Sequence, residues 1–142
     1  MNRVLITGGA GFTGTNAAAR FLRAGRHVVV FDNLSRRGAV DNVVWLKEQD
    51  GAENLEVVVG DVRMPSAELK GAVESCDLVL HLAGQVAVTT SVIDPMTDFE
   101  VNALGTLNLL ELIRSSEGNR PALFYSSTNK VYGGMELSLI HI

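Results

Sequence analysis

The chain contains 142 residues, of which 46% are hydrophobic and 20% charged, a length that suits one globular domain rather than two. Sixteen acidic and twelve basic residues give a net charge of −4 without a basic tract, which argues against a broad nucleic-acid-binding surface. The single cysteine excludes a disulfide framework, and the three scattered histidines show no metal-ligand spacing. No apolar run exceeds four residues, so we expect neither a membrane span nor a secretory leader, and a cytoplasmic location.

Short runs rich in Val, Leu and Ile alternate with longer amphipathic stretches, a pattern typical of a parallel sheet covered by helices. Most of these runs are apolar at every position, which predicts strands buried on both faces. The five predicted strands are Arg3–Thr7, His27–Asp32, Leu55–Gly60, Asp77–Leu82 and Ala122–Ser127.

Four helices are predicted between these strands, each with apolar residues at intervals of three and four. The longest begins with Asp94 and Pro95, an N-terminal acceptor followed by a residue that needs no partner for its nitrogen. Ser66 is predicted to cap the third helix in the same way. The four ranges are Phe12–Ala24, Val40–Glu48, Ser66–Val73 and Asp94–Ser115.

Right-handed crossovers place the first strand centrally, so the sequence predicts a Rossmann-like, doubly wound α/β sheet in the order 3-2-1-4-5. A ligand crevice is expected where the first and fourth strands part. We expect residues 1–134 to form this domain, cut short after the fifth strand. Residues 135–142 have no turn or stop signal and are expected to be a non-native tail, derived from a library adaptor.

A glycine-rich turn lies between the first strand and its helix, where the dinucleotide-binding fingerprint is expected. Gly8, Gly11 and Gly14 fit the spacing G-x-x-G-x-x-G, and Gly9, Gly11 and Gly14 fit G-x-G-x-x-G. One glycine can turn the chain, one can admit a pyrophosphate, and one can let helix and strand approach closely. The alternative interpretation is a glycine-rich turn with a purely structural role.

Asp32 ends the second strand, eighteen positions after Gly14, close to the spacing at which an acidic residue accepts the adenosine ribose hydroxyls of NAD. A carboxylate there would repel the 2′-phosphate of NADP, although Arg36 and Arg37 follow closely and could offset the repulsion. NAD is therefore the favoured cofactor. A turn or helix-capping role for Asp32 is the alternative.

Two further segments follow strands and face the expected crevice. Asp61 could accept a hydrogen bond from an adenine amino group, or could simply be a turn residue before Pro65. Ala83 and Gly84 keep the side chains small after the fourth strand. Cys76, His81 and Met96 are interpreted as core or helix-surface residues.

The combined motifs are similar to those of extended short-chain dehydrogenases/reductases, specifically the NAD-dependent nucleotide-sugar epimerase/dehydratase group. They cover nearly the whole chain before the tail. The motifs are the glycine fingerprint, FDNLS at 31–35, GDVR at 60–63, HLAG at 81–84, Asn102 with Gly105 and Thr106, and SST at 126–128 with VYG at 131–133. Within the group, the segments 35–46, 84–91 and 127–133 most resemble the subfamily of CDP-paratose 2-epimerases.

The resemblance implies a role for each matching residue. The cofactor-binding positions would be Gly8, Gly11, Phe12, Thr13, Gly14, Asp32, Asn33, Ser35, Arg36, Asp61, Val62, Leu82, Ala83, Gln85, Asn102 and Ser126. Thr89 and Ser91 would face the substrate, and Thr128 would occupy the catalytic Ser/Thr position beside the sugar oxygen. The partner would be a nucleotide sugar, with a CDP-sugar favoured, and the longer parent is expected to be a homo-oligomer.

One motif of the group is missing from these residues. Its general base is a tyrosine followed four positions later by a lysine, but Asn129 follows Tyr125 and Glu136 follows Tyr132 at that offset. An unperturbed tyrosine has a pKa near 10 and needs a nearby positive charge to act as a base at neutral pH. We therefore expect an inactive N-terminal part of an epimerase. A UDP-glucose 4-epimerase, a 4,6-dehydratase, a decarboxylase or a non-catalytic NAD-binding module are the alternatives.

Overall fold

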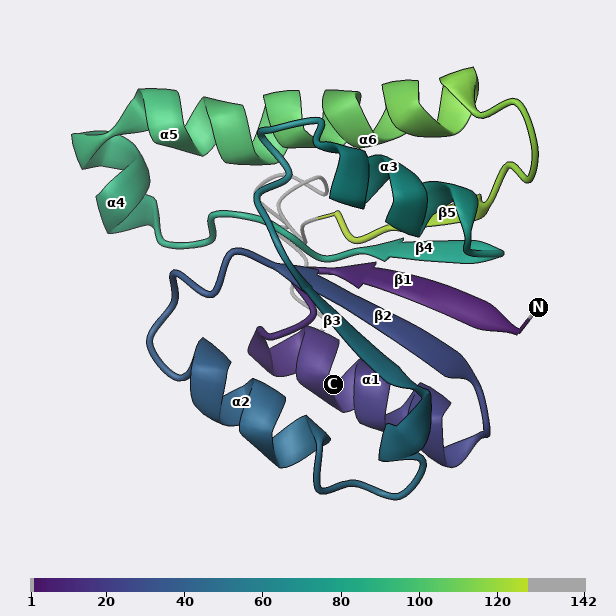
Figure 1. Ribbon diagram of the computed structural model, residues 1–142. Coiled ribbons are helices and arrows are strands. Elements are labelled where there is room, and N and C mark those ends of the chain that lie inside the picture. Colours follow the sequence, from purple (N-terminus) through teal and green to yellow (C-terminus); the bar gives the residue numbers. More distant parts are fainter. Residues whose placement is uncertain (1, 128–142) are drawn as a thin grey trace, which may run out of the picture.

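The computed structural model describes residues 2–127, which form one parallel five-stranded sheet flanked by helices on both faces (Figure 1). The spatial strand order is β3-β2-β1-β4-β5, which confirms the prediction of a Rossmann-like fold. β1 lies in the centre and pairs in parallel with β2 and β4. The strands are β1 (Arg3–Thr7), β2 (His27–Asp32), β3 (Leu55–Val59), β4 (Leu78–His81) and β5 (Ala122–Tyr125).

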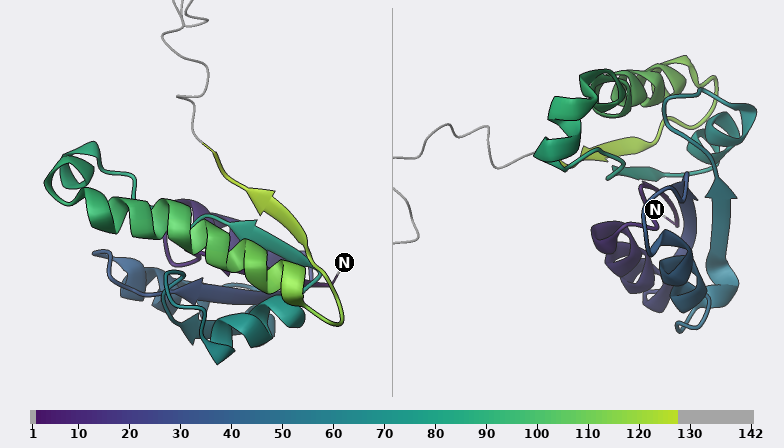
Figure 2. Two further views of the ribbon diagram at one scale, coloured as in Figure 1. Left: turned by 90° about the horizontal axis from the view of Figure 1, so that it is seen from above. Right: turned by 90° about the vertical axis from the view of Figure 1, so that its left-hand side faces the viewer.

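Successive residues of the central strands contribute to two separate cores, which explains why these strands are apolar throughout. Val4 and Ile6 of β1 pack with α1 on one face, whereas Leu5 packs against α3 and α6 on the other. Figure 2 shows these two helical layers on opposite sides of the sheet. The helices of the two layers are α1 (Phe12–Arg23), α2 (Ala39–Leu46), α3 (Ala67–Glu74) and α6 (Gly105–Ser115).

The outer strands are less buried than their composition predicts. β5 leaves Phe124 60% and Tyr125 52% exposed. Within residues 2–127, β5 pairs only with β4 and β3 only with β2. Both are edge strands and therefore lack the second neighbour that buries β1.

Two helix starts agree with the sequence. The Leu69 amide donates to Ser66 Oγ over 3.2 Å at the start of α3. The Thr97 amide donates to Asp94 Oδ1 over 3.1 Å, and Pro95 is the first residue of α5 (Pro95–Phe99). These contacts satisfy amides that have no partner inside the helix.

The helix predicted over Asp94–Ser115 is continuous from Pro95 to Ser115, but its middle, η2 (Glu100–Leu104), is π-helical and lies between α5 and α6. The apolar repeat continues through this wider turn and so gives no sign of it. Two elements were not predicted: α4 (Val88–Ile93), whose sequence VTTSVI is a weak helix former, and the 3₁₀ turn η1 (Ala52–Asn54). None of the described helices is long and apolar enough to cross a bilayer.

Candidate functional site

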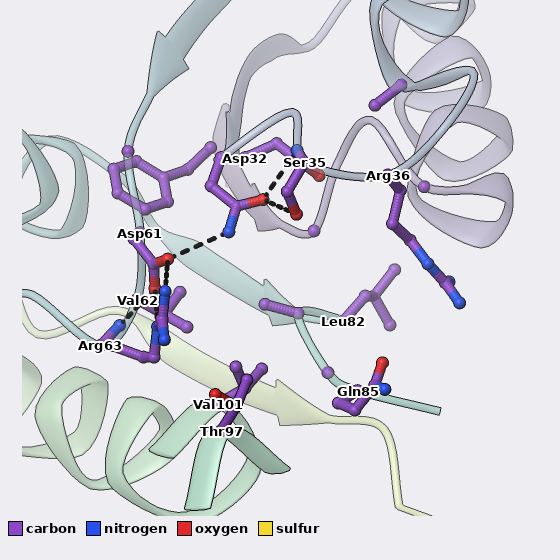
Figure 3. A pocket seen from close by; sticks show the side chains of 18 of the residues that line it. Asp32, Ser35, Arg36, Asp61, Val62, Arg63, Leu82, Gln85, Thr97 and Val101 are labelled. Carbon is purple, nitrogen blue, oxygen red and sulfur yellow. Dashed lines mark hydrogen bonds and ion pairs between the residues drawn. The ribbon is translucent and has the colours of Figure 1, made fainter. Parts of the chain in front are cut away.

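A cleft of about 490 Å³ opens at the carboxyl ends of the strands, where β1 and β4 lead into different layers. Figure 3 shows side chains from four parts of the chain around it: Asp32 and Ser35, Asp61 and Arg63, Leu82 and Gln85, and Thr97 and Val101. The cleft therefore lies at the topological switch point, the usual ligand position in an open α/β sheet. Of the predicted site residues, those on its wall are Gly8, Gly11, Asp32, Asn33, Ser35, Arg36, Asp61, Val62, Leu82, Ala83 and Gln85.

The other predicted site residues do not line this cleft. Phe12 is 85% exposed at the start of α1, beside Thr13 and Gly14. Asn102 lies behind Gln85, and Ser126 follows β5 on the surface. Thr89 and Ser91 belong to α4, whose Thr90 reaches the wall instead. Thr128 and the tail at 135–142 lie outside the described residues.

The glycine turn is shaped by close backbone contacts. Gly8 has a φ of +67°, and its amide donates to the Phe31 carbonyl over 2.9 Å. A Cβ at Gly8 would lie 2.6 Å from the Ala83 nitrogen. A Cβ at Gly14 would collide with the Gly8 carbonyl oxygen and lie 2.7 Å from the Gly9 Cα. Gly8 therefore turns the chain against the end of β4, and Gly14 lets α1 approach the turn.

Asp32 joins the loops that follow β1 and β2. Its Oδ2 accepts from the Ala10 amide over 3.0 Å, and its Oδ1 accepts from the Leu34 amide over 2.8 Å. The Leu34 contact makes Asp32 a turn residue, the alternative that the sequence left open. Each carboxylate oxygen can accept two hydrogen bonds and here accepts one of these, so each keeps one acceptor position for a ligand hydroxyl. The turn role and a ribose-binding role are compatible.

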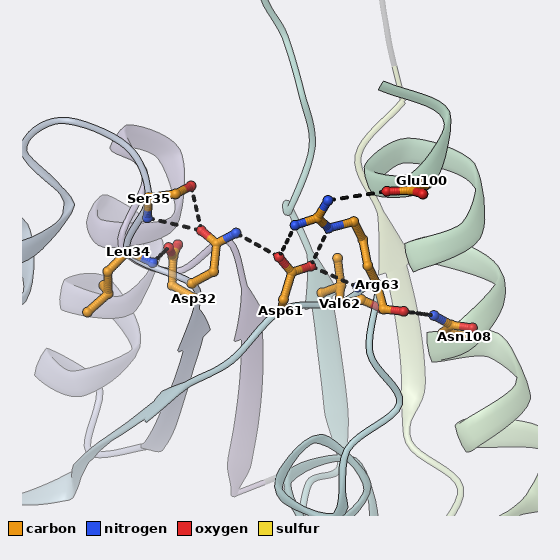
Figure 4. Close-up of polar contacts among 9 residues, drawn as sticks. Asp32, Leu34, Ser35, Asp61, Val62, Arg63, Glu100 and Asn108 are labelled. Carbon is orange, nitrogen blue, oxygen red and sulfur yellow. Dashed lines mark hydrogen bonds and ion pairs between the residues drawn. The ribbon is translucent and has the colours of Figure 1, made fainter. Parts of the chain in front are cut away.

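Asp61 lies in a polar cluster with Arg63 and Glu100 (Figure 4), and Asn33 also belongs to this cluster. Its Oδ1 accepts from the Arg63 amide and Nε over 2.9 and 3.0 Å. Its Oδ2 accepts from Arg63 Nη2 over 2.8 Å and from Asn33 Nδ2 over 3.0 Å. Arg63 Nη1 also donates to Glu100 Oε2 over 3.3 Å, which links the β3–α3 loop to η2.

These contacts occupy all four acceptor positions of the Asp61 carboxylate. The hydrogen bonds from Arg63, helped by its positive charge, lower the pKa of Asp61 to about 2. An adenine amino group would have to share an acceptor with Arg63 or Asn33. The sequence suggested an available acceptor, because it gave no sign that Arg63 would fold back onto Asp61.

We expect Asp61 to contribute to stability in a pH-dependent way. Its pKa is lower in the folded chain than the value of about 3.9 in an unfolded chain, so its contribution is present above pH 4. That contribution is lost as the pH falls from 4 towards 2. In urea unfolding, the stability difference between wild type and Asp61→Asn should therefore shrink over this range. Asp50→Asn removes an exposed charge and serves as the control; a constant difference for Asp61→Asn would contradict the prediction.

Asn102 of η2 fixes the loop that follows β4. Its Oδ1 accepts from the Gln85 amide over 2.9 Å, and its Nδ2 donates to the Gln85 carbonyl over 3.2 Å. Nδ2 also donates to Asp98 Oδ1 over 3.1 Å, and that oxygen accepts from Ser91 Oγ over 2.7 Å. Asn102 and Ser91 thus support the cleft wall from behind.

His81, the last residue of β4, is buried beside the same wall with 1% of its surface exposed. Its Nδ1 lies 2.6 Å from Thr7 Oγ1, and its Nε2 lies 3.0 Å from Thr106 Oγ1. The Tyr125 ring lies beside it, with centroids 5.7 Å apart. Burial lowers the pKa of His81 to about 4, so the ring is neutral at pH 7.

Sequence reasoning assigned no site role to several cleft residues: Phe31, Ala39, Gly60, Arg63, Thr97 and Val101. Arg63 was part of the quoted GDVR motif, which was the only available signal for it. Thr97 and Val101 reach the cleft only because α5 and η2 pass over it. Their spacing of four residues is also that of an ordinary helix, so it gave no sign of the cleft.

The fold and the cleft define a Rossmann-like domain of the class that binds dinucleotides. The family model described as GDP-mannose 4,6 dehydratase matches residues 5–141, and the chain belongs to this family. It is 49% identical over 138 residues to CDP-paratose 2-epimerase of Salmonella typhi, covering 94% of this chain and 39% of that protein. It is 35% identical over 137 residues to UDP-glucose 4-epimerase of Pisum sativum, with the same two coverages.

Solved structures show the same likeness. UDP-glucose 4-epimerase of Stenotrophomonas maltophila, with bound NAD and formylated UDP-arabinopyranose, has a TM-score of 0.84 and 28% identity, covering 96% of this chain and 40% of that one. The Bifidobacterium longum enzyme with NAD⁺ and UDP has a TM-score of 0.75 and 32% identity, covering 93% and 38%. The chain thus spans about two fifths of the length of these relatives.

Proposed function

We propose that this chain is the NAD-binding part of a nucleotide-sugar epimerase. The observation that carries the proposal is the position of Asp32, whose carboxylate bridges the glycine turn and the loop after β2 at the wall of the cleft. A dinucleotide there would place its pyrophosphate at the glycine turn and start of α1, and its adenosine ribose at Asp32. The solved relatives that contain NAD support this choice of cofactor.

The residues around the cleft divide the proposed binding work. Asn33, Ser35 and Arg36 extend the adenosine side beyond Asp32, and Val62 lies near the adenine position. Leu82, Ala83 and Gln85 follow β4 and would line the nicotinamide side. We assign Phe12 and Thr13 to the pyrophosphate through the start of α1, and Asn102 to support of Gln85.

Cofactor binding can be tested by calorimetric titration of the 142-residue chain. We expect NAD to bind at least tenfold more tightly than NADP, because a 2′-phosphate would lie against the Asp32 carboxylate. Asp32→Asn removes that charge and should lower NAD affinity about tenfold, a change in binding free energy of about 1.4 kcal/mol. The same variant should show a smaller preference for NAD over NADP. Asp41→Asn, on α2 away from the cleft, is the matched control. Equal or tighter binding of NADP by the wild type would refute the assignment.

For the longer protein, we propose CDP-paratose 2-epimerase activity. The support is the 49% identity to the Salmonella typhi enzyme, against 32–40% to several UDP-glucose 4-epimerases. NAD would supply transient oxidation at C2 of the sugar. The Thr128 hydroxyl would hydrogen-bond the sugar oxygen, and Thr89 and Ser91 would face the substrate from α4. Because Tyr125 and Tyr132 lack a lysine four positions later, we expect the 142-residue chain to bind the cofactor without epimerising a sugar.

Substrate choice is tested on a longer protein that carries this sequence. We expect its kcat/KM for CDP-paratose to exceed that for UDP-glucose by at least a hundredfold, because a site that pairs polar groups with one nucleotide sugar discriminates strongly against another. NMR detection of the C2 epimer is the measurement. Preferential turnover of UDP-glucose would favour the UDP-glucose 4-epimerase alternative, to which the chain is also similar.

We also propose that the longer protein is cytoplasmic and forms a homo-oligomer. The buried free thiol of Cys76 is compatible with a reducing compartment. The exposed side chains of Phe99 on α5 and of Leu107 and Leu110 on α6 support pairing of two copies.

A further inference from the structure

His81 is part of a series of hydrogen bonds whose donors and acceptors can be deduced from the end of the series at Asn102. Thr106 Oγ1 lies 2.7 Å from the Asn102 carbonyl, which can only accept, so the Thr106 hydroxyl proton is used there. Thr106 Oγ1 must therefore accept from His81 Nε2–H over 3.0 Å. In a neutral ring the other nitrogen, Nδ1, is then an acceptor, and the Thr7 hydroxyl donates to it over 2.6 Å.

The opposite end of this hydrogen-bond series reaches the cleft wall. Thr7 Oγ1 also accepts from the Ala83 amide over 3.4 Å. Ala83 lines the cleft and lies against Gly8, the residue after Thr7. The complete series runs from the Ala83 amide through Thr7, His81 and Thr106 to the Asn102 carbonyl.

Asn102 connects this hydrogen-bond series to Gln85, which lies on another part of the cleft wall. The main-chain oxygen of Asn102 ends the series, while its side chain holds both backbone groups of Gln85. The His81 imidazole thus connects the glycine turn and the start of the loop after β4 to the helical segment that carries Asn102. Asn102 in turn supports the rest of that loop. Thr7 and His81 are fully buried, which protects the hydrogen bond between them from competition by water.

Resting on the proposed NAD-binding function, we propose that His81 is a positioning residue for the nicotinamide half of the cleft. Held as the Nε2–H tautomer between Thr7 and Thr106, it fixes the separation between the glycine turn and the Gln85 loop. The adenosine half depends on Asp32, which lies outside this hydrogen-bond series. Changes at His81 should therefore affect the two halves of the dinucleotide unequally.

The unequal effect is measured by titrating the 142-residue chain with NAD and with AMP, which contains only the adenosine half. His81→Phe keeps a ring and removes both hydrogen bonds; we expect NAD affinity to fall about tenfold and AMP affinity to stay within twofold. His81→Gln can still donate towards Thr106, and His81→Asn can still accept from Thr7. Because the Thr106 side leads to Asn102 and Gln85, Gln should restore more NAD affinity than Asn.

The tautomer has its own spectroscopic readout. In ¹⁵N-histidine-labelled protein, the ring-nitrogen shifts and couplings of His81 should report an Nε2–H, unprotonated Nδ1 ring at pH 7. An Nδ1–H tautomer, or an imidazolium, would overturn the proposed hydrogen-bond direction. His81→Gln provides the assignment control, because it removes the His81 signals.

The binding outcomes separate the two proposals. If wild-type chain binds NAD and His81→Phe binds it equally well, the positioning role is refuted and the proposed function stands. Equal losses for NAD and AMP would show a general structural role and likewise refute positioning. If the folded wild-type chain binds neither ligand, the proposed function fails, and the positioning role fails with it.

Discussion

Replacing Gly8 by alanine should remove a large part of the stability of this domain. A φ of +67° costs an L-residue about 1–2 kcal/mol. The new Cβ would also lie 2.6 and 2.8 Å from the Ala83 nitrogen and Cα, where overpacking costs roughly 1–3 kcal/mol more. We expect the free energy of unfolding, measured in urea, to fall by roughly 2–5 kcal/mol against a typical total of about 5–15.

Gly25 offers a matched control for this experiment. It has a φ of +70°, and a Cβ there would meet no atom within 4 Å. Gly25→Ala should therefore lower the free energy of unfolding only by the backbone cost. The additional loss in Gly8→Ala then measures the energetic effect of the close approach of Gly8 to Ala83. Equal losses for the two variants would show that this approach carries no energetic weight.

Asn102→Asp should have the second large effect, although it changes only the amide to a carboxylate. The Nδ2 group donates to the Gln85 carbonyl and to Asp98 Oδ1, so an oxygen in its place would face two acceptors. Losing these bonds should lower the free energy of unfolding by about 2–3 kcal/mol. Because Gln85 lines the cleft, NAD affinity should fall as well.

A second substitution tests the cause of this loss. In the Asp98→Asn, Asn102→Asp double variant, the new amide at residue 98 can donate to the new carboxylate at residue 102, so the hydrogen bond is restored in the reverse direction. We expect about half of the lost stability to return, with the remainder due to the Gln85 carbonyl. A double variant with the summed losses of the two single variants would show that the contact between residues 98 and 102 is not the cause.

The sequence predicted the sheet well because buried parallel strands are continuous apolar runs. β1 and β2 have the predicted bounds, and their connections to β3, β4 and β5 allowed few topologies. The π-helical segment η2 could not be predicted in the same way. Its apolar spacing continues that of α5, and the features next to it, Gly105 against Val62 and Asn102 against Gln85, are tertiary contacts.

The candidate site shows the same limit. Asp32 was predicted from its distance to the glycine turn, since that spacing is set by one strand-helix-strand unit. Asp61 was recognised, but its saturation by Arg63 depends on a turn geometry that residue identities do not specify. His81 is buried, as predicted for a core residue, but its hydrogen-bond partners Thr7 and Thr106 could not be predicted because they are 74 and 25 positions away in the chain.

The contact between Gly8 and Ala83 has a consequence for synthesis of the protein. Thr7 and Leu82 also bond across this junction, so the glycine turn reaches its final shape only when β4 has been made. A nascent chain that ends before β4 carries the whole fingerprint sequence without the Leu82 and Ala83 backbone that lies against Gly8. Such long-range parallel pairing is slow to form, and until β4 pairs with β1 the open edge of β1 can pair with other chains. Co-translational chaperone demand should therefore be highest before residue 82 leaves the ribosome.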